Sequence, residues 1–310
     1  MAPQILWIGL GNMGRGMSKN LVEKGNLDKP LLLYNRTKKR SDDLAASLPS
    51  GKTEVVEQIG PAVQRADIIF TCLTNDAAVQ AVYAEALKQE GQAKGKIFVE
   101  CSTIHPDTTE AVAKDVQAQG ASFVASPVFG APPMADAGQL IFVIAGAAKV
   151  LNQVRPYMKG VMGKAEIAFE DEPYGKPLQL KLIGNTFIVN MVTALAEGLT
   201  MAEKTGVGVA PLKQFVDNLF GGPYSAYSER MLQGIYWKRE EPLFAATGAR
   251  KDVRHATSVA KAAGMEPRLA AVADGYLKDV EDHQGGEKGD IAGIYGAARK
   301  RAGLKFENDA

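Results

Sequence analysis

Gln4-Ile5-Leu6-Trp7-Ile8 runs directly into Gly9-Leu10-Gly11-Asn12-Met13-Gly14, and a helical pattern follows as far as Lys24. The apolar run predicts a buried strand, and the GxGxxG spacing predicts a tight turn into a helix. Gly9 permits the turn, Gly11 lets backbone approach a pyrophosphate, and Gly14 lets helix and strand pack closely. The helix N-terminus offers unpaired N–H groups to the phosphates. A dinucleotide site is therefore expected, a ligand-free structural corner being the alternative, and its predicted contacts are Gly9, Leu10, Gly11, Asn12, Met13 and Gly14.

The end of the second predicted strand, 30–34, indicates which dinucleotide binds. Asn35, Arg36 and Thr37 follow that strand, where an NAD site usually places a carboxylate on the ribose 2′-hydroxyl. A carboxylate would repel a 2′-phosphate, whereas an arginine can clamp one through charge-assisted hydrogen bonds. We therefore expect NADP(H), held by these three residues. A solvated basic start to a surface helix is the alternative interpretation, above all for residues 38–40.

The bulk composition is that of a globular protein with about two domains. The chain has 310 residues, of which 46% are apolar and 23% charged, and its formal net charge is +1. This balance favours neither a nucleic-acid nor a membrane partner. Cys72 and Cys101 are expected to be buried thiols, and the sequence has no CxxC pair or Cys/His cluster, so no metal is predicted. With no targeting segment recognised, a cytoplasmic location is expected.

Strand and helix patterns alternate through the first half of the chain. This alternation, with short connections, predicts a mainly parallel, doubly wound sheet wrapped by helices over residues 1–174. Beyond the first two strands, further strands are expected at 66–71, 96–100, 122–125, 140–145 and 166–169. Helices are expected at 13–24, 76–88, 106–119 and 150–158.

The alternation of strand and helix patterns ends near residue 175. Residues 177–203 then form one long apolar helical pattern. Apolar residues fall on every side of this helix, so it is expected to be buried nearly all round, against the first domain and a partner subunit. A membrane span is the alternative, which Lys181, Asn185 and Asn190 disfavour. From there the pattern is helical, broken at glycines and prolines. An all-α second domain over 175–310, a long interdomain helix and a homodimer are therefore predicted.

Lys181 is the residue with the strongest chemical signal. No other charged side chain occurs between Lys176 and Glu197, and lysines are rarely buried without a reason. Asn185 lies one helical turn later on the same side of the helix. Lys181 and Asn185 could both contact one substrate oxygen, the lysine amine as general acid or base and the asparagine amide as hydrogen-bond donor. A lysine that extends from the helix to water is the alternative.

The chain resembles the β-hydroxyacid dehydrogenases, which include 3-hydroxyisobutyrate dehydrogenase and the glyoxylate and succinic semialdehyde reductases and are related to 6-phosphogluconate dehydrogenase. The matching motifs occur in order over most of the chain, at 9–21, 100–104, 126–130, 175–185 and 251–252. The resemblance implies a Rossmann domain followed by a helical domain. It places the catalytic lysine at Lys181 and its helper asparagine at Asn185. It places further cofactor contacts at Leu73, Thr74, Thr103 and Lys251.

The predicted substrate loop departs from the family pattern. Where the family commonly has Asp-Ala-Pro-Val-Ser-Gly-Gly, this chain has Ala125-Ser126-Pro127-Val128-Phe129-Gly130-Ala131. Phe129 replaces a hydroxyl that helps to hold the substrate carboxylate, and a phenyl ring favours a bulkier or more apolar substrate. Ser126, Phe129, Gly130 and Ala131 are the predicted substrate contacts.

These observations predict an NADPH-dependent reductase of a small aldehyde or keto acid, reversible as a hydroxyacid dehydrogenase. An imine reductase of the same architecture is the alternative, although such enzymes usually carry Asp or Tyr at the lysine position. A non-catalytic NADP-binding scaffold is a third interpretation. Retention of Lys181 with Asn185 disfavours it.

Overall fold

The computed structural model describes residues 2–310 and divides into two compact units, Met1–Lys181 and Leu182–Ala310. The division falls inside the long helix α8 (Gly175–Lys204), later than the boundary predicted between residues 174 and 175. Each unit has its own apolar core.

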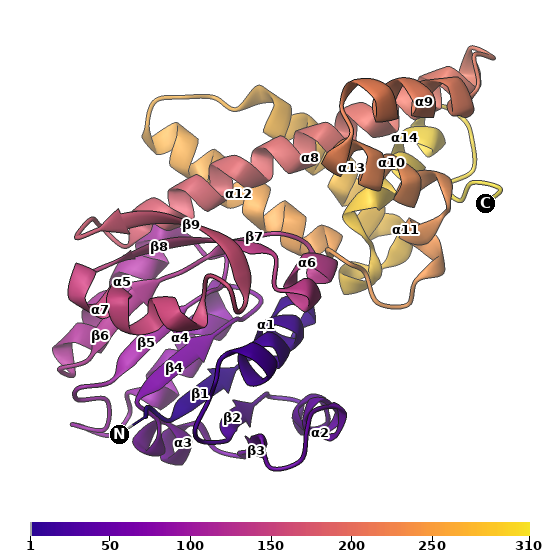
Figure 1. Cartoon of the computed structure of the whole chain (residues 1–310). Coiled ribbons are helices and arrows are strands. Elements are labelled where there is room, and N and C mark those ends of the chain that lie inside the picture. Colours follow the sequence, from indigo (N-terminus) through magenta and orange to yellow (C-terminus); the bar gives the residue numbers. More distant parts are fainter. Residues whose placement is uncertain (1) are drawn as a thin grey trace. The chain divides into compact units, whose positions relative to one another are not determined.

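A mainly parallel sheet forms the centre of the first unit (Figure 1). Over residues 2–310 it has nine strands in the order β3-β2-β1-β4-β5-β6-β8-β7, with β9 paired to β8. Pairing is parallel from β3 to β6 and between β8 and β9, and antiparallel where β8 meets β6 and β7. The strands are β1 (Ile5–Ile8), β2 (Leu31–Tyr34), β3 (Thr53–Val55), β4 (Ile68–Thr71), β5 (Ile97–Glu100), β6 (Ser122–Ala125), β7 (Val128–Phe129), β8 (Leu140–Gly146) and β9 (Gly163–Glu170).

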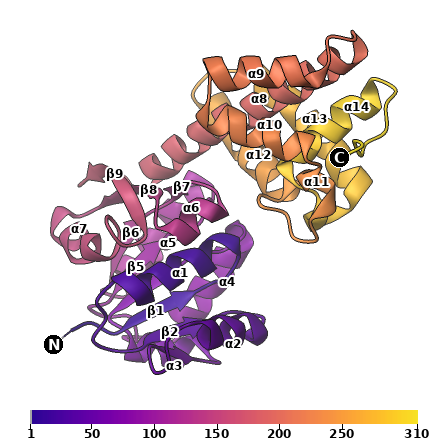
Figure 2. The ribbon, with the colours of Figure 1, turned by 45° about the vertical axis from the view of Figure 1, so that its right-hand side comes forward.

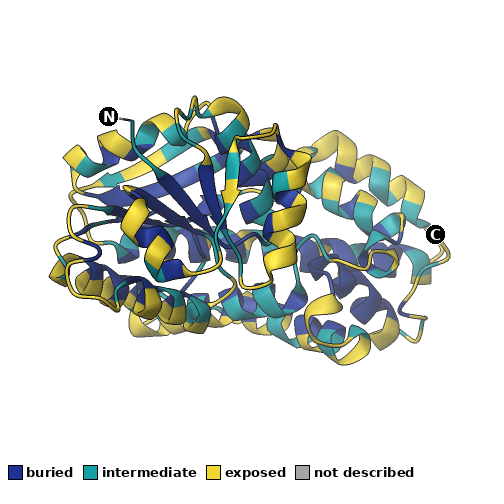
Figure 3. Ribbon diagram, turned by 90° about the horizontal axis from the view of Figure 1, so that it is seen from below, coloured by how far each residue is buried: buried dark blue, intermediate teal, exposed yellow. Residues whose placement is uncertain are grey.

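Helices cover both faces of this sheet, because successive strand residues point to opposite sides and both sides are apolar. Trp7 packs with α1 on one face, stacked on Phe70 with ring centroids 5.5 Å apart, and Leu6 and Ile8 pack with α3 to α5 on the other. Figure 3 shows the strands buried and the outer helix faces exposed. The helices of this unit are α1 (Asn12–Lys24), α2 (Lys38–Ser47), α3 (Ile59–Arg65), α4 (Asp76–Ala86), α5 (Pro106–Ala118), α6 (Pro132–Ala137), α7 (Ala148–Val154) and the 3-10 turn η1 (Arg155–Tyr157).

The predicted doubly wound α/β fold is confirmed, and the differences are local. The structure adds the short strands β3 and β7 and the short helices α3 and α6, which lack the long periodic pattern that marks an element in sequence. The helix predicted at 150–158 is α7 followed by η1, since Pro156 removes a backbone donor there. Strand β9 begins earlier than expected, at Gly163.

The second unit is helical throughout the part of it that the structure describes, as predicted (Figure 2). Its core gathers the buried side of α8 from Val189 to Leu199 with α12, α13 and α14, and it includes Tyr236, while Tyr224, Tyr227 and Trp237 pack against it. After α8 its helices are α9 (Val209–Leu219), α10 (Gly222–Leu232), α11 (Ile235–Lys238), α12 (Ala246–Ala262), α13 (Arg268–Gln284), η2 (Gly286–Lys288), η3 (Ile291–Gly293) and α14 (Ile294–Arg301).

Helix α8 has one exposed side in the single chain, as expected if a partner subunit covers that side, and the partner subunit stays a prediction. Ile183, Phe187 and Met201 are exposed by 51%, 72% and 65%. They lie at intervals close to whole helical turns and so share one side of the helix. By length and composition α8 is also apolar enough to span a membrane, with a mean hydropathy of 1.4, but half of that window is buried in protein. A core helix of a soluble protein has the same properties, so this is weak support for a span.

Candidate active site

Five loops of the first unit leave the sheet at one edge. The register aligns Ile8 with Tyr34 and Thr71, aligns Thr71 with Glu100, and aligns Glu100 with Ala125. Because these strands are parallel, the residues that follow them lie at the carboxyl edge, where such sheets bind their ligands. The predicted contacts in the glycine turn and at 35–37, 73–74, 103 and 126–131 are therefore brought to one edge.

The glycine turn leaves room for a ligand at one position and none at the two others. A Cβ built on Gly14 would lie 2.1 Å from the carbonyl oxygen of Gly9, and one built on Gly9 would lie 2.3 Å from that of Cys72. At Gly11 it would meet nothing within 4 Å, so this backbone is open to an approaching group. Gly11 is also the N-cap of α1, which has no side-chain cap and no acidic residue in its first turn. The turn therefore fits a pyrophosphate.

The side chain of Asn35 joins the glycine turn to the end of β2. Its Oδ1 accepts a hydrogen bond from Leu10 N at 2.9 Å, and its Nδ2 donates to Thr37 O at 3.0 Å. Arg36 and Thr37 are exposed beside it. The stretch 35–40 holds no carboxylate, so nothing in it repels a 2′-phosphate.

The next two loops are tied together by a serine that the sequence analysis did not single out. The amide of Leu73 donates to Ser102 Oγ at 2.7 Å, while Thr74 is exposed and Thr103 half-buried. Cys101 is buried as expected, whereas Cys72 is half-buried, and the apolar surroundings of its thiol raise the pKa of Cys72 to about 12. Both thiols are therefore unreactive, as expected of structural cysteines.

The predicted substrate loop is exposed unevenly. Ser126 is completely buried at the end of β6, Phe129 and Ala131 are half-buried, and Gly130 is exposed. Gly130 has a φ of 141°, a conformation that side chains rarely adopt, so it must be glycine for the chain to turn from β7 towards α6.

Lys181 is buried, as predicted, with 8% of its surface exposed. Its Nζ lies 4.7 Å from the centroid of the Phe129 ring, over the ring face. This cation–π contact joins the predicted catalytic lysine to the predicted substrate loop. Asn185 follows one turn later on α8 and is also buried.

The two predicted site residues of the second unit are both held by Asp252. Asn185 Nδ2 donates to Asp252 Oδ2 at 2.7 Å, and Lys251 Nζ lies 2.8 Å from Asp252 Oδ1. Asp252 is itself buried on α12. An acid directly after a predicted cofactor lysine is the sequence signal for this partner, but its contact with Asn185 crosses 67 residues.

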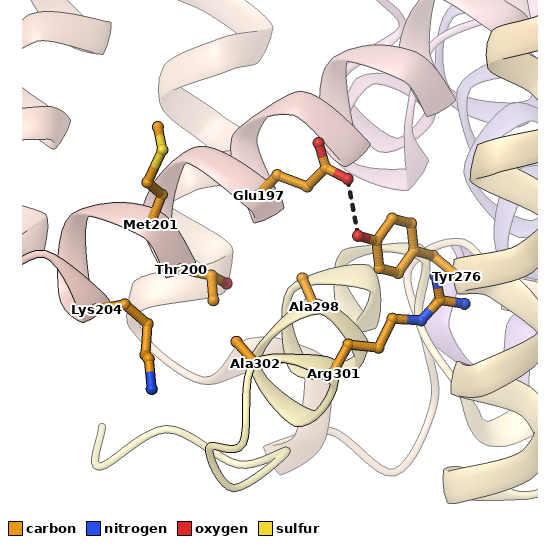
Figure 4. Close-up of a pocket in the computed structure, with 8 residues that line it drawn as sticks. All are labelled: Glu197, Thr200, Met201, Lys204, Tyr276, Ala298, Arg301 and Ala302. Carbon is orange, nitrogen blue, oxygen red and sulfur yellow. Dashed lines mark hydrogen bonds between the residues drawn. The ribbon is translucent and has the colours of Figure 1, made fainter.

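A surface hollow of the second unit contains none of the predicted site residues (Figure 4). It lies between the end of α8, α13 and α14. Tyr276 donates to Glu197 Oε1 at 2.8 Å there, and Arg301 is bound to Asp279 and stacked on the Tyr276 ring. Its main polar side chains are thus already paired, and we assign it no function.

Comparison with known proteins places both units in one family. Residues 4–168 match the family model described as the NAD binding domain of 6-phosphogluconate dehydrogenase. Residues 175–297 match the one described as NAD-binding of NADP-dependent 3-hydroxyisobutyrate dehydrogenase. The chain is 34% identical to NADH-dependent oxidoreductase ucdB of Aspergillus ustus over 95% of its length and 98% of that protein's. It is 27% identical to the mitochondrial 3-hydroxyisobutyrate dehydrogenase of Drosophila melanogaster, over 96% of this chain and 90% of the relative.

Solved structures share the fold. A 3-hydroxyisobutyrate dehydrogenase from Salmonella typhimurium has a TM-score of 0.81 at 18% identity, covering 94% of this chain and 98% of its own. An imine reductase from Streptomyces aurantiacus has a TM-score of 0.61 at 18% identity, covering 96% of this chain and 99% of its own. At these identities the likeness shows the fold alone.

Proposed function

The chain belongs to the β-hydroxyacid dehydrogenase family of NAD(P)-dependent oxidoreductases, and we propose that it uses NADPH to reduce the carbonyl group of a small aldehyde or keto acid. The reverse reaction oxidises the corresponding β-hydroxyacid. The observation that carries the proposal is Lys181, a buried lysine whose ammonium group lies over Phe129 of the substrate loop.

Lys181 acts as the general acid in reduction. When bound, the nicotinamide cofactor supplies the hydride, and negative charge then develops on the carbonyl oxygen. The Lys181 ammonium group gives its proton to that oxygen, and in the oxidative direction the amine takes it back. Asn185 stabilises the same oxygen with the amide N–H that Asp252 leaves available.

The preference for NADPH is supported by the residues that follow β2. Arg36 and Thr37 are exposed directly after β2, and residues 35–40 hold no carboxylate that would repel a 2′-phosphate. The relative from Aspergillus ustus is named as NADH-dependent. The ratio of kcat/KM for NADPH and NADH on this chain decides between the two cofactors.

The substrate loop supports a carbonyl substrate with an apolar or bulky substituent. Phe129 places an aromatic ring where the family pattern has a hydroxyl group, and this ring can contact an apolar substituent. The backbone of its exposed neighbour Gly130 is accessible to a polar group of the substrate. An imine reductase is the second candidate, favoured by the same apolar ring and disfavoured by Lys181. NADPH consumption with parallel panels of aldehydes, keto acids and cyclic imines separates the two.

The exposed side of α8 supports a homodimer. Ile183, Phe187 and Met201 form an apolar stripe on the second unit, and Phe215 and Leu219 of α9 are exposed as well. A second copy offers the same apolar chemistry, and an obligate dimer would hide about 2,000 Å² or more. The cytoplasmic location stays a prediction from the sequence.

Lys181→Met tests the proposed reaction, because the substitution keeps the length of the side chain and removes the proton. The variant is expected to bind NADPH with wild-type affinity and to lose hydride transfer by about a hundredfold or more in stopped-flow measurements. Lys176→Met, at a half-buried lysine paired with Glu172 on the first turn of α8, is the matched control. Turnover of the Lys181 variant within a few-fold of wild type would refute the assignment.

A further inference from the structure

Glu100 is a carboxyl group buried completely at the carboxyl edge of the sheet, and the proposed reaction does not use it. It is the last residue of β5, and the loops that follow β4 and β5 carry predicted cofactor contacts. One oxygen, Oε1, accepts from Ser102 N at 2.6 Å, and the other, Oε2, accepts from Thr71 Oγ1 at 2.6 Å. A buried carboxyl costs free energy unless it is paired in this way.

The contacts of Glu100 extend to both cofactor loops. Ser102, held by Glu100, accepts from Leu73 N at 2.7 Å, so the loop after β4 is fixed through the loop after β5. Leu73 and Thr74 lie in the first of these loops and Thr103 in the second. All three are predicted cofactor contacts.

The network accommodates a neutral or an ionised Glu100 without movement of heavy atoms. With an ionised carboxylate, Thr71 donates its proton to Glu100, and Tyr83 OH, 3.2 Å away, donates to Thr71. With a protonated carboxyl, Glu100 donates to Thr71 Oγ1, and Thr71 turns its proton to Val99 O at 3.3 Å. The amide of Ser102 donates to Oε1 in both cases.

We propose that Glu100 is a positioning residue that holds the loops 72–74 and 101–103, and that its ionisation favours the oxidised over the reduced form of the bound cofactor. The oxidised nicotinamide carries one more positive charge than the reduced one, so a buried negative charge at this edge attracts it. The inference rests on the proposed function only in that the cofactor is a nicotinamide dinucleotide.

The surroundings of Glu100 place the ionisation of its carboxyl group close to neutral pH. Burial raises the pKa of Glu100 to about 7. The hydrogen bonds from Ser102 and Thr71 act in the opposite direction, because they favour the ionised form. Tyr83 from α4 and the thiols of Cys72 and Cys101 also face it, and burial raises the pKa of each. These three stay neutral at pH 6 to 8. The ammonium group of Lys181 acts electrostatically on the neighbouring Cys72 thiol.

The test measures dissociation constants of NADP⁺ and NADPH by equilibrium fluorescence and calorimetry from pH 5.5 to 8.5, with no turnover. For the wild type, the affinity for NADP⁺ relative to NADPH is expected to rise about fivefold or more as the pH increases through 7. Glu100→Gln keeps the size of the side chain and cannot ionise, so its ratio is expected to stay constant. Glu85→Gln, at an exposed acid of α4, is the control and keeps the wild-type profile.

Two further variants keep the test informative if Glu100→Gln does not fold. Thr71→Val removes a donor that favours ionisation, so the midpoint of the ratio moves to higher pH. Ser102→Ala removes another side-chain hydrogen bond that favours ionisation, so it also moves the midpoint to higher pH. In addition it weakens binding of both cofactor forms, because it frees Leu73 N. A constant ratio in the wild type, or a pH-dependent ratio in Glu100→Gln, would overturn the proposal. Since Lys181→Met is scored by hydride transfer and these variants by binding, failure of one inference is distinguishable from failure of the other.

Discussion

The amide nitrogen of Asn185 donates to the Asp252 carboxylate at 2.7 Å, and this contact orients the Asn185 side chain. A carboxylate only accepts hydrogen bonds, so the amide nitrogen must face Asp252 and the carbonyl oxygen must point away from it. One amide N–H remains for a substrate oxygen. Asp252 thus acts through Asn185 and, by its ion pair, through Lys251.

Asp252→Ala is expected to lower kcat/KM by about tenfold to a hundredfold, because removing one partner leaves buried polar groups unsatisfied. In Asp252→Asn, the side-chain oxygen can still accept from Asn185, but the charge that pairs with Lys251 is lost. Relative to Asp252→Ala, this variant is therefore expected to regain most of kcat, whereas its KM for the cofactor stays raised. Steady-state kinetics at saturating and limiting NADPH separate the two effects. Asp282→Ala, at an exposed acid of α13, is the control. Equal kinetics in the Asp252 variants and the control would contradict this role.

Arg36→Asp is expected to move the cofactor preference towards NADH. The substitution replaces the proposed partner of the 2′-phosphate with a group that repels it and accepts from a ribose 2′-hydroxyl. The ratio of kcat/KM for NADPH and NADH should fall by about a hundredfold or more. Arg40→Asp, a few residues further on, is the comparison. NADPH selectivity that is unchanged in Arg36→Asp would exclude the proposed clamp.

Gly14→Ala and Gly11→Ala are expected to fail in different ways. The added Cβ at Gly14 would lie 2.1 Å from backbone, so this variant should lose about 2 kcal/mol or more of folding free energy in urea denaturation. The Cβ at Gly11 meets nothing, so that variant should fold normally and lose cofactor affinity. A stable Gly14 variant, or a Gly11 variant with full affinity, would show that the turn works differently.

Stability is expected to fall as the pH rises from about 4.5 to 7, because of Glu100. Below its ordinary pKa of 4.5 the carboxyl is protonated in both states, whereas the pKa in the folded protein is about 7. Between these two pH values Glu100 is ionised in the unfolded chain but still protonated in the folded one. The free energy of unfolding therefore falls by up to about 3 kcal/mol, and above pH 7 it falls no further on this account. Glu100→Gln should therefore gain stability relative to wild type from pH 4.5 to 8 in urea titrations. A constant difference would contradict this linkage.

The apolar stripe on α8 is expected to hold two copies of the chain together. Light scattering at micromolar concentration should give twice the mass of the chain for wild type. Phe187→Glu combined with Met201→Glu should give a monomer, because both substitutions place charges on the buried face of the dimer. Lys204→Glu changes a charge at the end of the same helix and should stay dimeric. A monomeric wild type would remove the homodimer from the proposal.

The architecture of both units and the identity of the candidate lysine could be predicted from the amino-acid sequence. The apolar strands, the glycine turn and the single lysine at 181 are local patterns, and each sets backbone conformation or burial through neighbours close in the chain. Short elements such as β7, with two residues, and α6, with six, are too brief to show a repeated pattern. The sequence predicts that α8 is apolar on every side, but it does not show which side packs within the chain and which side is exposed, because the tertiary contacts decide this.

The pairing of side chains, in contrast, became known from the three-dimensional structure. Phe129 meets Lys181 across 52 positions of numbering, Asn185 meets Asp252, and Glu100 joins the loops that follow β4 and β5. Spacing along the chain does not predict these contacts, because sheet register and helix packing bring distant residues together. The chemistry of each residue can be read from its type. Its orientation, and hence its role, comes from the neighbours that the fold supplies.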